Sequence, residues 1–558
     1  MRDTPAKSNK AVRNQAGQIK LTRSGLLDRQ AWEEAGVKLP GYDVSAVAEE
    51  TIRHCGWIHF GAGNLFRAYP AMLQQRLIRS GDAGTGILAV VDAVSETPEK
   101  IYAPYDHLSL AVTLDADGRF DKEVLGCIAD VLRADPRKPD WQKLVRAFCS
   151  PDLQIATFTV TEKGYATHLP DGTVRPELAQ DLKQGPEKGV NLLTAVTALL
   201  FRRYRAGGMP LALVSLDNCA QNGRRLGDAI RFIADAWQKN GWVDLGFIAY
   251  LSDGAGISFP WTMIDKITPY PSEIVRDHLQ SLGIADMDIL RTGRGSLSAP
   301  FVNAERQGYL VIEDRFPNGR PPLEQTGVLF TDRETVEKVE KMKVGTCLNP
   351  LHTALALLGC LLCYPTVASA MTHPLLPGFL RAMAMEEGMP VLEDPVLLDP
   401  VKFLDEVLEE RLRNPFLPDT PKRIATDTSQ KIPVRFGTTL QKYAAVQPDR
   451  LQELRYIPFV FACWLRYLLA TDDRGNPMEL SPDPRLANLR KAVEGIEVGS
   501  PWNPGPGVED LLHDRETFGN DLWSAGLAEA VMELFRQMCE GPGAVEKVLT
   551  RITGKSDT

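Results

Sequence analysis

Residues that commonly hold metals or form disulfides are scarce and scattered in this sequence. Its 558 residues include eight histidines, and the H-x-x-x-H and Cys–His spacings typical of zinc sites do not occur. The nine cysteines are an odd number without framework spacing, which is typical of reduced thiols in a cytosol. Cys360 and Cys363 form a C-x-x-C inside an apolar run, without a second pair, so we interpret both as core thiols. We therefore expect no bound metal and a cytoplasmic protein.

The chain also lacks an excess of basic charge and an apolar leader. A net charge of −9 and a pI of about 5.6 argue against a nucleic-acid partner and against an anionic membrane. The N-terminus is polar, and we expect residues 1–40 to form a flexible extension. Residues 344–380 contain no Asp, Glu, Lys or Arg, but Pro365 leaves an apolar run of only about 15 residues, and a membrane span needs roughly 20. A buried core helix is the better interpretation.

Short apolar runs alternate with helix-like segments in the first part of the chain. Runs at 57–60, 86–91, 153–161 and 211–216 have the composition of buried strands, and helical patterns follow several of them. This alternation is typical of a parallel sheet with crossover helices. We therefore expect a Rossmann-like α/β domain over residues 41–335.

One strand pair and the second half of the chain depart from this alternation. In residues 110–124 two alternating strands flank Asp-Gly, which predicts a hairpin. After about residue 335 strand signals nearly vanish, so we expect a mainly α-helical domain over residues 336–558. Because clefts between domains commonly hold active sites, the polar residues just after this junction are candidates for one.

A strand, a glycine turn and a helix follow one another in WIHFGAGNLFRAYPAML, residues 57–73. Gly61 and Gly63 would permit a tight turn and let backbone N–H groups approach a pyrophosphate at the helix N-terminus. Phe66 stands where the third glycine of G-x-G-x-x-G would be. Two glycines after a strand also form ordinary turns, so the order of strand, turn and helix is what favours a dinucleotide site.

An acidic residue ends the second predicted strand, in VVDAVSE. Asp92 could accept hydrogen bonds from both ribose hydroxyls of adenosine, although it lies 31 residues after Gly61, further than the usual ~20. A carboxylate would repel a 2′-phosphate, so we expect NAD rather than NADP as the cofactor. The alternative is that Asp92 only begins a turn.

Several separated motifs occur in one order along the chain. They are GAGNLFRA (61–68), TVTEKGY (159–165), SLDNCAQNG (215–223), FPWTMIDKITP (259–269), YLVIEDRFPNGRPPLEQTGV (309–328), LNPLHTALALLG (348–359) and RIATDTSQKIP (423–433). Together they resemble the mannitol dehydrogenase family, the long-chain polyol and hexuronate dehydrogenases. The first motif adds Asn64 and Arg67 to the expected cofactor contacts Gly61, Gly63, Phe66 and Asp92.

The resemblance implies catalytic roles for a lysine, two asparagines and a histidine. Lys343 would be the general acid/base of a metal-free hydride transfer, and Asn218 and Asn349 would donate hydrogen bonds to the developing oxyanion. His352 would orient a substrate hydroxyl. The family usually separates the lysine and the asparagine by five positions, whereas Lys343 and Asn349 are six apart, so Lys341 stays an alternative. From the residues alone, a solvated lysine, a helix cap and a core histidine are equally open interpretations.

Four further residues are implied to serve the substrate. Arg423 and Lys431 could bind a carboxylate, since a guanidinium matches carboxylate geometry. Asp265 is expected near the site, in contact with the substrate or with a neighbouring lysine. Glu162 would either relay protons or pair with Lys163 or an arginine.

The motif TCLNPLH, residues 346–352, is most similar to the fructuronate-reducing branch of the family. We therefore expect an NAD-dependent enzyme that reduces a keto-hexuronate, fructuronate to mannonate or tagaturonate to altronate, and that catalyses the reverse oxidation. A mannitol-type polyol 2-dehydrogenase is the alternative. A non-catalytic nucleotide or sugar sensor on the same fold is an alternative of another class.

Overall fold

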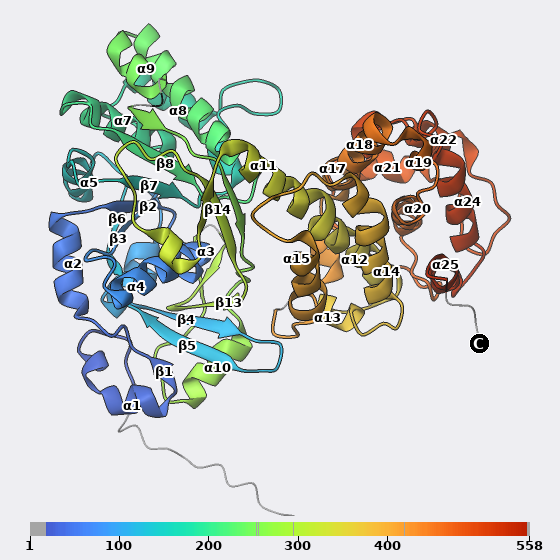
Figure 1. Cartoon of the computed structure of the whole chain (residues 1–558), viewed down its shortest axis with the longest axis horizontal. Coiled ribbons are helices and arrows are strands. Elements are labelled where there is room, and N and C mark those ends of the chain that lie inside the picture. The colour runs from blue at the N-terminus through green and yellow to red at the C-terminus, as the bar shows by residue number, and fades with distance from the viewer. Residues whose placement is uncertain (1–17, 253, 255, 294, 418, 555–558) are drawn as a thin grey trace, which may run out of the picture.

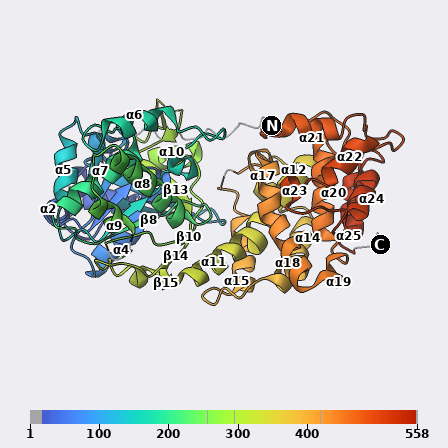
Figure 2. The ribbon, with the colours of Figure 1, turned by 90° about the horizontal axis from the view of Figure 1, so that it is seen from above.

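Two parts of different architecture lie side by side in the computed structural model, which describes residues 18–252, 254, 256–293, 295–417 and 419–554 (Figure 1). The first part contains the sheets and ends with β15 (Leu329–Thr331), and the second is helical and begins with α11 (Arg333–Met342). Seen from above, α11 leads from one part to the other (Figure 2). The predicted fold class, a Rossmann-like α/β part followed by a mainly helical part, is confirmed. The division expected at residue 335 falls within the first turn of α11.

A six-stranded parallel sheet forms the centre of the first part. In spatial order its strands are β6 (Ile128–Arg133), β3 (Ile87–Val91), β2 (Trp57–Phe60), β7 (Ile155–Phe158), β8 (Leu211–Ser215) and β9 (Ile257–Ser258). Every residue of β2, β3, β7 and β8 is buried, which is why these strands appear in the sequence as continuous apolar runs. These four strands confirm the four that the sequence predicts.

Helices cover both faces of this sheet and bury it in two separate cores. One face carries α5 (Asp140–Phe148), α7 (Leu192–Arg205) and α8 (Asn222–Lys239), and the other carries α3 (Asn64–Ala68) and α4 (Pro70–Ser80). The carboxyl ends of β2 and β3 are therefore left open between helices, where a parallel sheet of this kind places its ligands.

Besides a two-stranded sheet of β11 (Leu290–Arg291) and β12 (Leu297–Ser298), two sheets of four and three strands complete the first part. In one, β4 (Ser109–Leu114) pairs antiparallel with β5 (Phe120–Leu125), which confirms the predicted hairpin, and parallel with β13 (Phe301–Glu305). In the other, β14 (Tyr309–Glu313) lies between β10 (Thr262–Asp265) and β15. The last residues of β10 and β13 both face the helical part through contacts described below.

The expected flexible N-terminal extension needs correction. Residues 1–17 lie outside the described residues, but α1 (Arg29–Glu34) and β1 (Val37–Lys38) are ordered elements of the fold. β1 pairs with β5, and Trp32 is fully buried. Although the segment is rich in polar residues, its one large aromatic side chain, Trp32, is buried in the fold. The prediction of a flexible extension is therefore wrong for residues 18–40.

The helical part is built around two apolar helices, α12 (Asn349–Leu361) and α20 (Tyr456–Leu468). Around them pack α14 (Leu376–Ala382), α18 (Thr438–Val446), α24 (Ala528–Met538) and α25 (Ala544–Ile552). The helical stretch Arg333–Leu361 is long and apolar enough to span a membrane, yet 72% of its apolar window is buried inside the protein. That burial agrees with the core helix that the sequence predicts.

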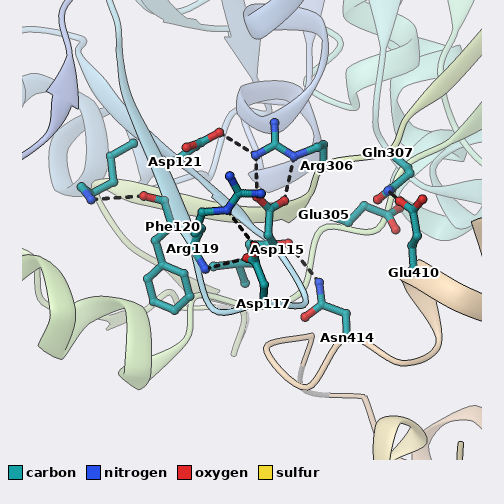
Figure 3. Close-up of polar contacts among 12 residues, drawn as sticks. Asp115, Asp117, Arg119, Phe120, Asp121, Glu305, Arg306, Gln307, Glu410 and Asn414 are labelled. Atoms are coloured by element: carbon teal, nitrogen blue, oxygen red, sulfur yellow. Dashed lines mark hydrogen bonds and ion pairs between the residues drawn. The ribbon is translucent and has the colours of Figure 1, made fainter.

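Polar contacts join the two parts next to the β4–β5 hairpin (Figure 3). The Asn414 side chain donates from Nδ2 to the backbone oxygen of Leu114 at 2.9 Å, and Gln307 donates to Glu410. Each bond links the sheet part to the helical part. The helical part is therefore seated on the ends of β4 and β13.

Candidate active site

The glycine turn after β2 is fixed by its backbone geometry. Gly61 has a φ of +111°, and a Cβ added there would lie 2.2 Å from the backbone oxygen of Thr159. Its N–H donates to the backbone oxygen of Val90 at 2.8 Å, so the turn is tied to β3. Only glycine fits such a position. The turn that Gly61 makes lets the chain enter α3 directly after Gly63.

A cleft of about 990 Å³ opens at this turn. Gly61, Gly63, Asn64 and Asp92 line it, so the structure brings together four of the six predicted cofactor residues. The Asp92 side chain also accepts from the backbone N–H of Val94 at 3.0 Å, so it begins a turn and lines the cleft at once. A cleft of this size, with a glycine turn at a helix N-terminus, fits a dinucleotide.

Phe66 and Arg67 do not line this cleft, and the expectation of direct cofactor contacts for them needs correction. Phe66 is fully buried and stacks on His59 with ring centroids 4.3 Å apart. Arg67 is also fully buried and donates to Asn64 Oδ1 at 2.8 Å and to the backbone oxygen of Ala299 at 2.6 Å. Both side chains are buried beneath the turn, and Arg67 holds Asn64 in place.

Lys343 lies at the end of α11, buried against the sheet part. It is 1% exposed, and its Nζ donates to Asn218 Oδ1 at 2.6 Å and to the backbone oxygen of Ile264 at 2.8 Å. Burial lowers the pKa of Lys343; Asp265 opposes this effect, since its negative charge stabilises the ammonium form. An amine with a lowered pKa inside a domain junction has the properties of a general acid/base.

The alternative, Lys341, has a different environment. It is exposed and pairs with Glu337 one helical turn away at 3.4 Å. A π-helical turn, Lys343–Cys347, separates α11 from α12, and such a turn holds one residue more than an α-helical turn. The spacing of six between Lys343 and Asn349 is therefore accommodated by the backbone, and Lys343 is the buried lysine.

Asn349 and His352 lie in the opening turn of α12. The structure shows no side-chain capping bond at this helix start, and the backbone oxygen of Asn349 accepts from Arg435 at 3.1 Å. His352 is partly buried, and burial, with Arg435 and Arg411 nearby, lowers its pKa to about 4. The imidazole is thus neutral near pH 7, a state that can accept as well as donate a hydrogen bond.

Asp265 ends β10 and binds an arginine that the sequence did not single out. Arg411 donates from Nη1 and Nη2 to the two carboxylate oxygens of Asp265 at 2.6 and 3.0 Å. The same guanidinium donates from Nε and Nη2 to Glu305 at 2.8 and 2.9 Å. The Asp265 carboxylate also acts on the charge of Lys343, so the structure places it near that lysine, and its contact with the substrate stays a prediction.

The remaining predicted residues lie on the helical part or at the surface. Arg423 is exposed and forms an ion pair with Asp419, and this hydrogen-bonded carboxylate raises the Arg423 pKa. Lys431 donates to the backbone oxygens of Ile424 and Thr426 at 2.7 and 2.5 Å, and burial lowers its pKa to about 8.

Glu162 is exposed and pairs with Arg225 at 3.1 Å. This contact matches the alternative of an arginine partner that the sequence analysis left open.

Arg411, Glu305 and Arg435 are polar residues of this region that sequence reasoning missed. Arg435 donates to the backbone oxygen of Asn349 and to Thr353 Oγ1, at 3.1 and 2.7 Å. None of the three lies within the family motifs quoted above, so the sequence around them did not identify them as site residues. In the described part of the chain, no group of three or more His, Cys, Asp or Glu residues could hold a metal ion.

Two family models match this chain, one in each of its two parts. The family model described as the mannitol dehydrogenase Rossmann domain matches residues 56–325, and the one described as the mannitol dehydrogenase C-terminal domain matches residues 335–539. The chain belongs to the mannitol dehydrogenase family. It is therefore an oxidoreductase, and the resemblance inferred from its motifs is confirmed.

Relatives within the family differ in the substrates that their names carry. A D-mannonate oxidoreductase of Thermotoga maritima is 46% identical over 97% of this chain and 100% of the relative. A mannitol 2-dehydrogenase of Cereibacter sphaeroides is 30% identical over 90% of this chain and 97% of the relative. The solved Pseudomonas fluorescens mannitol 2-dehydrogenase, a ternary complex with NAD and D-mannitol, has a TM-score of 0.70 and 26% identity, and the match covers 96% of this chain and 100% of that one.

Proposed function

We propose that the protein reduces a keto-hexuronate with NADH, D-fructuronate to D-mannonate or tagaturonate to altronate, and catalyses the reverse oxidation. The observation that carries the chemistry is the buried Lys343 amine, bonded to Asn218 at the junction of the two parts. The full-length likeness to a D-mannonate oxidoreductase favours a hexuronate as the substrate. We also propose that residues 41–335 and 336–558 act as cofactor and substrate domains, and that the protein is cytoplasmic.

Lys343 and Asn218 would act together on the substrate carbonyl. Because Lys343 donates to Asn218 Oδ1, the amide Nδ2 of Asn218 is left to donate to the carbonyl oxygen. Asn349 would supply a second amide donor, and a preorganised donor of this kind is typically worth about 2.7–4 kcal/mol. In the reduction, Lys343 Nζ transfers its proton to the oxygen as the carbonyl π bond breaks. In the oxidation it takes the hydroxyl proton back.

The cofactor would lie along the glycine turn. NAD(H) supplies or accepts the hydride when it is bound. Gly61, Gly63 and Asn64 would hold its pyrophosphate at the start of α3, and Asp92 would bind the adenosine ribose.

Asp92→Ala tests this assignment. It should weaken NADH binding more than NADPH binding, because the lost carboxylate both binds the ribose hydroxyls and repels a 2′-phosphate. Fluorescence titration with both nucleotides measures the ratio, and an unchanged ratio would place cofactor choice elsewhere in the cleft.

A substrate carboxylate would meet cations of the helical part. Burial lowers the pKa of both Lys431 and His352. Arg435 lowers both further, and Arg423 also lowers that of Lys431, so these four side chains lie near one another. Arg423 would move from Asp419 to the substrate, and Lys431 would keep its backbone bonds. His352 would orient a hydroxyl next to the reacting carbon. Glu162 would exchange protons with solvent.

A substrate panel tests the proposal. NADH oxidation is followed with fructuronate, tagaturonate and fructose side by side, and each is repeated with NADPH. Turnover confined to a hexuronate is the expected result. A preference for fructose would assign the protein to the polyol branch, to which the mannitol 2-dehydrogenases belong. Binding of NADH without turnover of any of the three would favour the sensor alternative.

A further inference from the structure

Arg411 occupies an unusual position between the two parts of the protein. It ends a π-helical turn of the helical part, Val407–Arg411, and is only 3% exposed. Its four hydrogen bonds go to Asp265 and Glu305, which are 5% and 1% exposed. One buried guanidinium thus satisfies two buried carboxylates that both belong to the sheet part.

The two carboxylates are held at strand ends that meet the helical part. Asp265 is the last residue of β10 and Glu305 the last residue of β13. Glu305 also accepts from the backbone N–H of Ile267 at 2.6 Å, which links the two strand ends. In Figure 3 Glu305 precedes Arg306 and Gln307, and Gln307 reaches Glu410, the neighbour of Arg411. Arg411 therefore enters the sheet part at the joint between the domains.

This cluster adjoins the Lys343 amine. Lys343 Nζ donates to the backbone oxygen of Ile264, the residue before Asp265. Asp265 forms its ion pair with Arg411 at 2.6 Å, and both of its oxygens accept from that guanidinium. The Asp265 carboxylate is therefore held by Arg411 although a second cation, Lys343, lies beside it.

We propose that Arg411 is a positioning residue for Lys343, because its guanidinium binds both oxygens of Asp265 and offsets the negative charge that would otherwise pair with the lysine amine. The proposal rests on the acid/base role proposed for Lys343. A lysine paired with a buried carboxylate would stay an ammonium ion and would exchange its proton poorly. Because Arg411 comes from the helical part, Lys343 is free to react only while the two parts are seated together.

The charges around Lys343 determine in which direction its pKa should change when Arg411 is replaced. Asp265 from β10, Glu340 from α11 and the Cys219 thiol after β8 each act to raise the Lys343 pKa. Burial lowers it, and Arg411 adds to that lowering. His352 from α12 acts on the same Asp265 carboxylate. Removing the guanidinium leaves Asp265 and Glu305 without their cation, so the Lys343 pKa should rise.

The first experiment measures that rise directly. Competitive acetylation at a series of pH values, followed by mass spectrometry, gives the pKa of Lys343, with the exposed Lys341 as an internal reference. In Arg411→Met the Lys343 pKa should rise by about 1–3 units, as expected when a carboxylate is released beside an amine. In Asp265→Asn/Arg411→Met most of that rise should disappear. The pH profile of kcat for the oxidation should move in parallel.

The double variant also removes one buried unpaired charge, so it should fold when Arg411→Met alone does not. Arg381 offers a matched control, because it is half-exposed and pairs with two carboxylates of the helical part, Asp405 and Glu409. Arg381→Met should leave the Lys343 pKa and the pH profile unchanged.

An unchanged Lys343 pKa in Arg411→Met, with kcat lowered equally at every pH, would overturn the proposal and leave Arg411 a structural joint. The labelling needs no substrate, so it stays informative if the wild-type protein turns over no hexuronate. In that case the proposed function fails, while a raised Lys343 pKa in Arg411→Met would still support the positioning role.

Discussion

At the scale of single residues, Lys343 combines burial with two hydrogen bonds that fix its amine at the domain junction. Lys343→Ala should lower kcat by about 10²–10⁴-fold, the usual range for a general acid/base, and leave NADH binding nearly unchanged. Steady-state kinetics and fluorescence titration measure the two effects. Lys341→Ala is the matched control, because Lys341 is exposed and two positions away, and it should keep near-normal turnover. The reverse pattern would transfer the role to Lys341.

The lowered pKa of Lys343 gives the pH dependence a definite sign. Oxidation needs the neutral amine, so its rate should rise with pH and level off at a pH below about 10.4, the ordinary value for lysine. Reduction needs the ammonium form, so its rate should fall across the same range. The His352 pKa of about 4 means that this imidazole adds no step near neutral pH. Measuring kcat against pH in both directions checks this, and a plateau only above about 10.4 would contradict a buried base.

The residues that the motifs contain were predictable, whereas their supporting partners were not. Asp265 and Glu305 lie 146 and 106 positions from Arg411 in the sequence. Nothing in VLEERLRNP distinguishes Arg411 from Arg413 or the two glutamates, because only the fold determines which side chain turns inward. The family motifs contain the residues that we propose to act on the substrate, whereas tertiary packing determines which other residues bind and hold them.

At the scale of elements, the glycine turn offers two substitutions with different expected effects on stability. Gly61→Ala should destabilise the protein by about 1–3 kcal/mol, because its φ is +111° and the added Cβ would meet the backbone of Thr159. Gly63→Ala should leave stability nearly unchanged, because an added Cβ there has no neighbour within 4 Å. Any effect of Gly63→Ala should appear as weaker NADH binding. Thermal unfolding without nucleotide separates the two, and equal losses of stability would contradict this account of the turn.

Strands and the hairpin followed from periodicity, but the π-helical turn between α11 and α12 did not. β2, β3, β7 and β8 are buried on both faces, so their apolar runs were clear signals. The turn Lys343–Cys347 has no composition that distinguishes it from an α-helical turn. This turn, which holds one residue more than an α-helical turn, accommodates the spacing of six between Lys343 and Asn349.

At the scale of the whole molecule, composition predicted the order of the two parts because strand and helix signals separate cleanly near residue 335. It did not predict the role of the N-terminal segment, where one buried tryptophan and a two-residue strand are enough to join β5. It also did not predict the seating of the helical part on β10 and β13. Those contacts join side chains that lie more than 100 positions apart in the sequence.

The reaction as proposed draws all of its charge stabilisation from protein side chains across the domain junction. Amide donors and one amine serve the reacting oxygen, and no cluster of potential metal ligands occurs among the residues that the structure describes. Incubation with EDTA, followed by removal of the chelator, should therefore leave kcat with a hexuronate unchanged. A zinc-dependent alcohol dehydrogenase treated in parallel should lose activity. If this protein also lost activity and regained it with added metal, the oxyanion would be stabilised by a cation, and Lys343 would need a different role.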